Sequence, residues 1–453
     1  MILLKKSIAL VISLLMFTTL LAGCDEQTEI QNPKNTVIPV NEEKEDNTQK
    51  LEKSTEIIRF RHFNGDEAKL LKEAFEAVYP NVTVELQVVE DTNGYSDFFP
   101  SILRYDECPD VYATEVAFVK RFVNISEAYE DLSAAPYNAE ELKNQIAPYT
   151  IDIGRSDDGK IRALSHQAAA GAVGYKRDIA KKYLGTDDSA EIGEMFSSAE
   201  NIIETAKKLQ KESGGKVKLF PNVEELMRMY LGAREQAWVE GNKLTIDPKI
   251  QEYVNVAKEL RDIGAEGGME PWSAKWANSI QDDIHFAYAI PTWGLSWIID
   301  VNQEEDEKKT GNWGLAKPPV PYTWGGTWFG IYKGSQNKEL AWEFIKFITL
   351  NEEQAISWAK SSGDFVSNLA AIKKLSKDET VINETINQNP YEFFEPMIGS
   401  INGAIMTKYD DQITNLFTEE MHKYLDGNIS EEQMWTQFKD NVRSDLGYKI
   451  EVE

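Results

Sequence analysis

The chain has 453 residues, of which 48 are basic and 75 acidic, so its formal net charge is −27. This length exceeds what a single hydrophobic core usually organises, which predicts two domains. The negative field opposes nucleic acid and anionic lipid, so functions that need a polyanionic partner are disfavoured.

The first 23 residues have the pattern of a secretion signal. Lys5 and Lys6 precede an apolar stretch from Ile8 to Leu20, and small residues stand just before Cys24. The stretch is too short for a membrane span, which needs roughly 20 apolar residues. Without the signal the chain keeps 46 basic and 75 acidic residues, a net charge of −29.

Residues 21–24, Leu-Ala-Gly-Cys, resemble the bacterial lipobox, in which the cysteine sulfur receives a diacylglycerol and the signal is cut ahead of it. The resemblance implies a mature protein that begins at Cys24 and is anchored to the outside of the cell membrane, since two or three acyl chains hold a protein stably. We expect a bacterial, Gram-positive source. Residues 24–56 are polar and acidic, which predicts a disordered tether. Cys108 has no disulfide or metal-ligand companion and is interpreted as structural.

The globular region opens with a strand, a helix and a second strand. β-branched and aromatic residues predict a strand at 57–63. Asn64 with Glu67 fits a helix capping pair, and Pro80 ends the helix. Residues 82–88 alternate as a strand, so the three elements indicate a βαβ unit with a parallel sheet.

Similar patterns continue along the chain. They predict a strand at 110–112, a hairpin-like turn at 157–160 between Ile153 and Ile161, a strand at 172–175, a mostly helical region to about 285, a strand at 327–331, a helix carrying Leu340 and Phe344, and a largely helical remainder. Small residues after His166 indicate a crossing between domains.

Four stretches occur in a characteristic order, namely 64–84, 108–111, 325–331 and 335–344. Together they resemble the extracellular solute-binding proteins of ABC importers, in the carbohydrate-binding group related to maltose-binding protein. The resemblance covers roughly residues 57–445. It implies an α/β fold of two lobes, each a mainly parallel sheet flanked by helices, with several hinge crossings and a ligand cleft between the lobes. The implied N-terminal lobe is 57–165 plus 320–362, and the C-terminal lobe is 166–319 plus 363–453.

Seven of the eleven tryptophans fall within residues 272–328. An indole stacks on the C–H face of a pyranose ring, and hiding roughly 50 Å² at about 25 cal/mol per Å² gives about 1 kcal/mol per stacked ring. The cluster therefore points to an oligosaccharide, although any single tryptophan could fill a core. The stacking candidates are Trp272 and Trp276 on a predicted helix, Trp324, Trp328 and Trp293. Residues 290–294, Ile-Pro-Thr-Trp-Gly, resemble the family's Gly-Pro-Trp segment with a threonine inserted.

Polar candidates follow strands or lie at predicted crossings. Open α/β sheets bind ligands at the carboxyl ends of their strands, and the resemblance implies sugar contacts from the first and third strand-to-helix loops. The candidates are Asn64, Asp66, Glu67, Glu115, His166 and Asp364. Helix capping explains the first three equally well.

The sequence thus predicts a monomeric receptor that captures an oligosaccharide by hinge closure and delivers it to the membrane subunits of an ABC permease. The four histidines lack metal-ligand spacing, and residues 154–160 mimic a P-loop but continue with Ile161, so we expect no catalytic residue, metal or cofactor. The alternatives are a receptor of the same fold for a peptide, polyamine or anion, a membrane-anchored carbohydrate-active enzyme, and a structural lipoprotein without a ligand.

Overall fold

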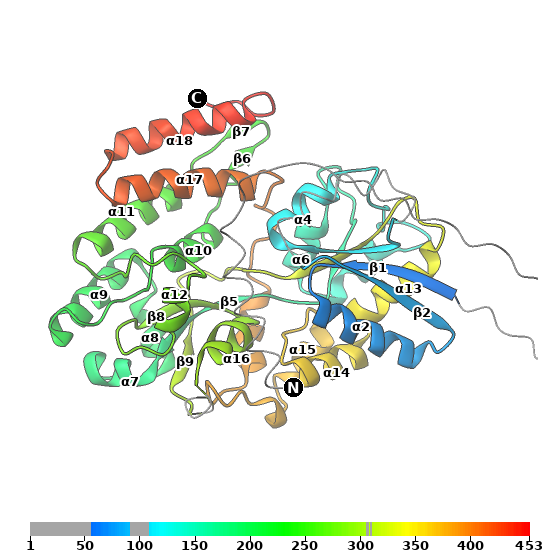
Figure 1. Ribbon diagram of the computed structural model, residues 1–453, viewed down its shortest axis with the longest axis horizontal. Coiled ribbons are helices and arrows are strands. Elements are labelled where there is room, and N and C mark those ends of the chain that lie inside the picture. The colour runs from blue at the N-terminus through cyan, green and yellow to red at the C-terminus, as the bar shows by residue number, and fades with distance from the viewer. Residues whose placement is uncertain (1–55, 91–107, 305–307, 309) are drawn as a thin grey trace, which may run out of the picture. The chain divides into compact units, whose positions relative to one another are not determined.

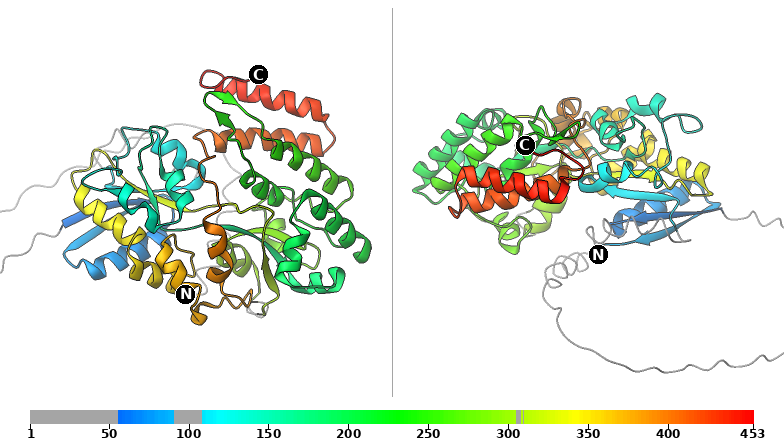
Figure 2. Two further views of the ribbon diagram at one scale, coloured as in Figure 1. Left: turned by 180° about the vertical axis from the view of Figure 1, so that it is seen from behind. Right: turned by 90° about the horizontal axis from the view of Figure 1, so that it is seen from above.

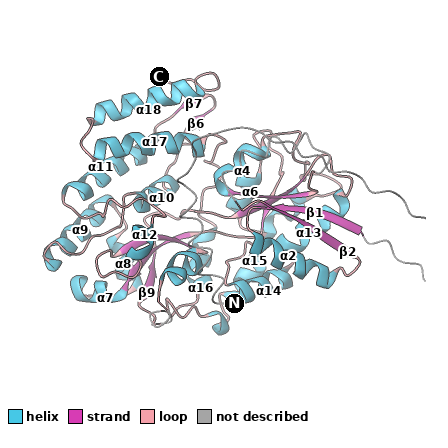
Figure 3. Cartoon of the chain, viewed as in Figure 1, coloured by secondary structure: helices cyan, strands magenta, loops and turns pink. Residues whose placement is uncertain are grey.

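Figure 1 shows the computed structural model, which describes residues 56–90, 108–304, 308 and 310–453. The predicted signal, Cys24 and the tether up to Thr55 lie outside the described residues. Strands in the described part form two larger sheets and one short hairpin, with helices around them (Figure 3). No helix in these ranges has both the length and the apolarity needed to cross a bilayer.

The first sheet has the strand order β2-β1-β3-β10-β4. Its strands are Glu56–His62 (β1), Val82–Val88 (β2), Val111–Glu115 (β3), Leu164–Ser165 (β4) and Thr327–Ile331 (β10). As the βαβ pattern predicts, β1 pairs in parallel with β2, and it also pairs in parallel with β3. The late strand β10 returns between β3 and β4 and runs antiparallel to both.

The helix between β1 and β2 is α2, Gly65–Val78, and it begins where the sequence predicts. Asn64 Oδ1 accepts a hydrogen bond from Glu67 N at 3.1 Å. The return bond of a capping pair does not form, because Asn64 N donates to His62 Nδ1 at 2.8 Å instead. The Glu67 carboxylate is therefore free to bind other side chains in the protein interior.

The second sheet has the order β8-β5-β9, with strands Gly171–Lys176 (β5), Ala287–Pro291 (β8) and Trp313–Ala316 (β9). Both pairings are antiparallel, so the expectation of a mainly parallel sheet in each lobe is wrong here. Every residue of the three strands is buried. Strands covered on both faces lose the alternation of an antiparallel strand, and their sequences therefore look like those of a parallel sheet.

Helices surround both sheets. Between the strands of the first sheet and after β10 they are Val116–Val123 (α4), Ala139–Leu142 (α5), Pro148–Gly154 (α6), Lys338–Thr349 (α13) and Glu352–Ser362 (α14). Between the strands of the second sheet they are Arg177–Ile179 (α7), Ser189–Met195 (α8), Ala199–Ser213 (α9), Glu224–Gly232 (α10), Pro248–Asp262 (α11) and Ala274–Ser279 (α12). Ile153 belongs to α6, so the turn at 157–160 follows a helix and not the expected strand.

The last part of the chain is helical, as predicted. It forms Leu369–Leu375 (α15), Pro390–Ile398 (α16), Asp410–Leu425 (α17) and Glu431–Leu446 (α18). The helices α17 and α18 lie side by side and α17 packs on α11 (Figures 1 and 2). The short hairpin of Val239–Glu240 (β6) and Lys243–Leu244 (β7) lies near the C-terminus.

Three segments that connect the sheets hydrogen-bond to one another. Residues 166–168 pair with 365–367 through backbone bonds of 2.9 and 2.8 Å, and residues 169–171 pair with 322–324 through bonds of 2.8 and 3.0 Å. The first segment therefore lies against both of the others. The lobe boundaries given above stay a prediction.

Tyr322 fixes the second of these pairings. Its side chain is fully buried, and its hydroxyl donates to the Ala172 carbonyl at 2.9 Å. Two glycines make room for it, since a Cβ at Gly171 would meet the ring at 2.0 Å and one at Gly232 would meet the tyrosine Cβ at 2.4 Å. Any side chain at either glycine would displace Tyr322.

We expect Gly171→Ala to lower the free energy of unfolding by about 1–3 kcal/mol, because it overpacks a buried ring. Urea unfolding followed by tryptophan fluorescence measures the change. Gly399→Ala is the matched control, since its Cβ would meet nothing within 4 Å and its φ is −73°; a change below about 0.5 kcal/mol is expected there. Equal effects at both positions would contradict the role given to Tyr322.

Candidate functional site

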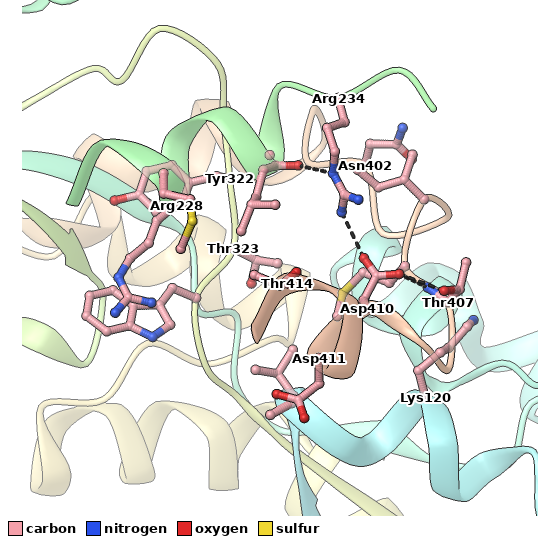
Figure 4. A pocket seen from close by; sticks show the side chains of 18 of the residues that line it. Lys120, Arg228, Arg234, Tyr322, Thr323, Asn402, Thr407, Asp410, Asp411 and Thr414 are labelled. Atoms are coloured by element: carbon pink, nitrogen blue, oxygen red, sulfur yellow. Dashed lines mark hydrogen bonds and ion pairs between the residues drawn. The ribbon is translucent and has the colours of Figure 1, made fainter. Parts of the chain in front are cut away.

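A cavity of about 390 Å³ opens where helices from the two sheets come together (Figure 4). One wall is α4, which packs on β3, and the opposite wall is α10, which packs on β8. Residues 321–324, 401–407 and the first turns of α17 complete the lining. The volume is within the range of small-ligand sites.

Three tryptophan rings touch at this place, and we call Trp272, Trp293 and Trp324 the tryptophan group. Trp324 lines the cavity. Trp272 stacks on Trp293 with ring centroids 6.2 Å apart and planes 12° apart, while Trp324 meets Trp293 edge-on at 5.2 Å. Trp293 Nε1 also donates to the Trp324 carbonyl at 2.7 Å. Three of the five stacking candidates thus form one group, and a fourth, Trp276, contacts its Trp272 ring with centroids 5.0 Å apart.

Trp272 does not lie on a helix as expected. The helix α12 starts at Ala274, with Ser273 Oγ accepting from Trp276 N at 3.2 Å as its cap. Trp272 precedes the cap with φ +64°, which is uncommon for a bulky residue and costs on the order of 1–3 kcal/mol. This backbone conformation places the ring of Trp272 over Trp293, and Trp272 is 55 % exposed.

The structure does not support the predicted ligand contacts of Trp276 and Trp328, because both rings lie in the core. Trp328 is 1 % exposed on β10, and its Nε1 donates to the Thr150 carbonyl at 2.8 Å. Trp276 is 2 % exposed, and its Nε1 donates to Glu225 Oε1 at 2.7 Å. Neither ring has a face that a ligand could reach.

His166 and Glu67 belong to a buried structural network and do not line the cavity. Glu67 Oε1 lies 2.8 Å from His166 Nε2 and 3.6 Å from His62 Nε2. Burial would raise the pKa of Glu67, but the two histidines hold it below its ordinary range. The network ties the start of α2 to the crossing segment, so this geometry does not support a ligand contact for either residue.

Three further polar candidates, Asn64, Asp66 and Asp364, also lie away from the cavity lining. Asn64 caps α2, and Asp66 is exposed in the first helical turn. Asp364 Oδ2 accepts from Gln167 Nε2 at 2.6 Å and from Trp358 Nε1 at 3.3 Å, and burial raises its pKa. Helix capping accounts for Asn64 and crossing contacts account for Asp364, while Asp66 is an acidic residue of the first helical turn, where the helix dipole favours negative charge.

Glu115 adjoins the cavity. Its Oε2 accepts from Ala117 N at 2.7 Å, and Val116 and Ala117 line the cavity directly. Burial raises the pKa of the half-buried Glu115 carboxyl to about 7, and the charge of Asp411 adds to the shift against the backbone hydrogen bonds. Asp411 lines the cavity from α17, so its charge acts on the Glu115 carboxyl at the end of β3.

Sequence patterns do not single out the cations of the cavity. Arg234 Nη2 pairs with Asp410 Oδ2 at 2.8 Å, Arg228 lies 3.5 Å above the Trp324 ring, and Lys120 Nζ donates to two carbonyls at 2.7 Å. All three come from helices or turns without a motif. Within the described ranges, no three histidine, cysteine or acidic side chains are grouped to hold a metal.

Residues 71–386 match the family described as bacterial extracellular solute-binding protein, over more than half of the chain. The chain belongs to this family. Members of the family are receptors for solutes outside the cell, and the two-lobed α/β fold predicted for this solute-binding protein is confirmed by solved structures that it resembles.

Three such structures illustrate the similarity. An extracellular solute-binding protein of family 1 has a TM-score of 0.74 at 19 % identity, covering 86 % of this chain and 99 % of the other. The GacH receptor of Streptomyces glaucescens, known unliganded and with acarbose, has 0.67 at 18 %, covering 88 % and 100 %. The galacto-N-biose-/lacto-N-biose I-binding protein of the ABC transporter from Bifidobacterium longum, in complex with lacto-N-biose, has 0.69 at 14 %, covering 89 % and 100 %.

Glu115 makes the stability of this solute-binding protein depend on pH. Because its pKa is raised on folding, it stabilises the fold below its unfolded value of 4.5, and this contribution is lost as the pH rises through about 7. We expect wild type to lose stability relative to Glu115→Gln between about pH 5 and 8, by urea unfolding. The glutamine oxygen can still accept from Ala117 N. The exposed Glu127→Gln is the control, and parallel profiles for all three proteins would contradict the prediction.

Proposed function

We propose that this protein is the extracytoplasmic receptor of an ABC importer and that it captures an oligosaccharide. The tryptophan group at the cavity carries the proposal, because indole faces suit the C–H faces of sugar rings. Polar side chains in the lining, among them Asn402, Thr414 and Asn415, suit the sugar hydroxyls. The family supports the receptor role. Sugar ligands in complexes of similar structures support the ligand class.

The proposed mechanism is hinge closure around the ligand. The cavity walls α4 and α10 pack on different sheets, and the connecting segments 166–171, 322–324 and 365–367 form the hinge. A sugar that touches both walls stabilises the arrangement in which they are close, and its differential affinity for that state is the driving force. The permease then recognises the closed form, and no covalent chemistry takes place.

A thermal-shift panel separates this function from its alternatives, since a ligand that binds only the native state raises stability by RT ln(1 + [L]/Kd). The panel contains neutral and acidic oligosaccharides, peptides and polyamines. Shifts with sugars alone are expected. Shifts with peptides or polyamines alone would overturn the carbohydrate ligand, and hydrolysis of a bound sugar would overturn the receptor.

Trp293→Ala should weaken binding of the best sugar from the panel by at least about 1 kcal/mol, roughly fivefold in Kd, because it removes one ring of the tryptophan group and the support of Trp272. Isothermal titration calorimetry measures Kd, and circular dichroism should show an unchanged fold. The control is Trp297→Ala, since Trp297 is 58 % exposed and makes no ring contact with the tryptophan group in the described chain. Unchanged affinity of Trp293→Ala would remove Trp293 from the site.

We also propose that a lipid on Cys24 anchors the receptor to the membrane of a Gram-positive cell. Replacing Cys24 by alanine should release the protein into the medium, where it still binds sugar but supports little uptake, because the receptor diffuses away from its permease. Cell fractionation and uptake of labelled sugar measure the two effects. Retention of the variant on the membrane would contradict the lipid anchor.

A further inference from the structure

One cation at the cavity lacks a direct acceptor. The Arg228 guanidinium lies 3.5 Å from the centroid of the Trp324 ring and is half-buried. In the described part of the chain it forms no hydrogen bond and no ion pair, and its Nε is buried without an acceptor. Burial lowers the pKa of Arg228, against the opposing effect of the charges on Glu225 and Glu224.

The acidic residues nearest Arg228 bind other groups, although one oxygen, Glu224 Oε2, is buried without a hydrogen bond in the described chain. Glu225 accepts from Trp276 Nε1 at 2.7 Å and from Ala289 N at 2.8 Å, one bond on each oxygen. Glu224 Oε1 pairs with His422 Nε2 at 2.5 Å. These carboxylates offset the charge of Arg228 at a distance, but they leave its donors unused.

The other cations of the cavity show the same surplus of donors. Arg234 is 5 % exposed, and its Nη1 is buried without an acceptor although Nη2 pairs with Asp410. Lys120 binds only backbone carbonyls. Figure 4 shows Arg228 at one end of the cavity and Lys120 at the other. Among the described residues that line the cavity, buried donors on Arg228 and Arg234 therefore lack acceptors, alongside one buried acceptor, Glu224 Oε2, that lacks a donor.

We propose that the cavity selects an acidic sugar, with one uronic-acid carboxylate on the guanidinium of Arg228 and the pyranose ring against the tryptophan group. The planar donor fork of arginine matches a carboxylate in a bidentate pair. Stacking on Trp324 fixes the plane of the fork before the ligand arrives, which reduces the ordering cost of binding.

The inference rests on the proposed function, since it names the chemistry of the oligosaccharide. The net charge of −29 after removal of the signal does not prevent it. At physiological ionic strength, exposed charges more than about 8 Å away are largely screened. The charges of the cavity itself therefore decide whether a single carboxylate is accepted. Asp410 is paired with Arg234 and Glu224 with His422, so Asp411 is the lining carboxylate that opposes the attraction of Arg228. A polyanion would still be repelled along its length.

Matched disaccharide pairs that differ only in a carboxylate test the proposal. One pair is α-1,4-digalacturonate with α-1,4-galactobiose, and the other is cellobiuronate with cellobiose. In at least one pair, the wild-type protein should bind the acid at least about 30-fold more tightly by calorimetry, as expected for hydrogen bonds to a charged group. Equal or tighter binding of the neutral partner, or no binding in either pair, overturns this proposal. Shifts with neutral sugars in the thermal panel would then leave the receptor function standing.

Variants test whether Arg228 is the cause. Arg228→Gln should lose the preference for the acid, and Arg228→Lys should recover only part of it, because lysine keeps the charge without the fork. The readout is the ratio of the two affinities within a pair, so a general weakening that affects the acid and the neutral partner equally does not count as a loss of preference. The control is Arg443→Gln, which removes the same charge from an exposed site on α18. An equal loss in the control variant, or an unchanged preference in Arg228→Gln, overturns the assignment, and circular dichroism verifies that each variant is folded.

Discussion

The pairing of residues 166–171 with two other segments is the constraint on which the site depends. Its first half hydrogen-bonds to 365–367 and its second half to 322–324. Trp324 N is itself part of this pairing, and the Trp324 carbonyl accepts from Trp293. The crossing of the chain between the two sheets therefore sets the positions of Trp324 and Trp293 in the tryptophan group.

The same crossing keeps the site rigid, which is compatible with the proposed hinge closure. Tyr322 fills the space left by Gly171 and Gly232, so the segment beside the cavity is closely packed. Trp324 contacts both of the large hydrophobic cores. Packed segments of this kind transmit small movements of the walls without deforming, which is what hinge closure around a ligand requires.

Local signals in the sequence are sufficient to predict the strand β1, the helix α2 and the strand β10, because capping residues and hydrophobic periodicity act over a few positions. The direction of the second sheet was missed, since strands buried on both faces carry no alternation. Trp276 and Trp328 were misplaced because residue type alone does not reveal which face of an element is covered. Arg228 was missed for a similar reason, since only tertiary packing brings α10 to Trp324.

The stacked pair of Trp272 and Trp293 limits how a sugar can bind. Carbon atoms in contact are about 3.5–4.0 Å apart, so a pyranose ring between two indoles would need planes roughly 7–8 Å apart. The centroids of the pair are only 6.2 Å apart, and one face of Trp293 is therefore covered by Trp272. A sugar must use the exposed outer face of Trp272 or displace that ring. The left-handed backbone of Trp272 is the strained element of the site. Displacement of the ring would relieve this strain, whereas stacking of a sugar on the ring would keep the strained backbone in place. If the sugar stacks on Trp272, Trp293 acts only as the support of that ring, whereas displacement of Trp272 would bring the sugar onto Trp293 itself.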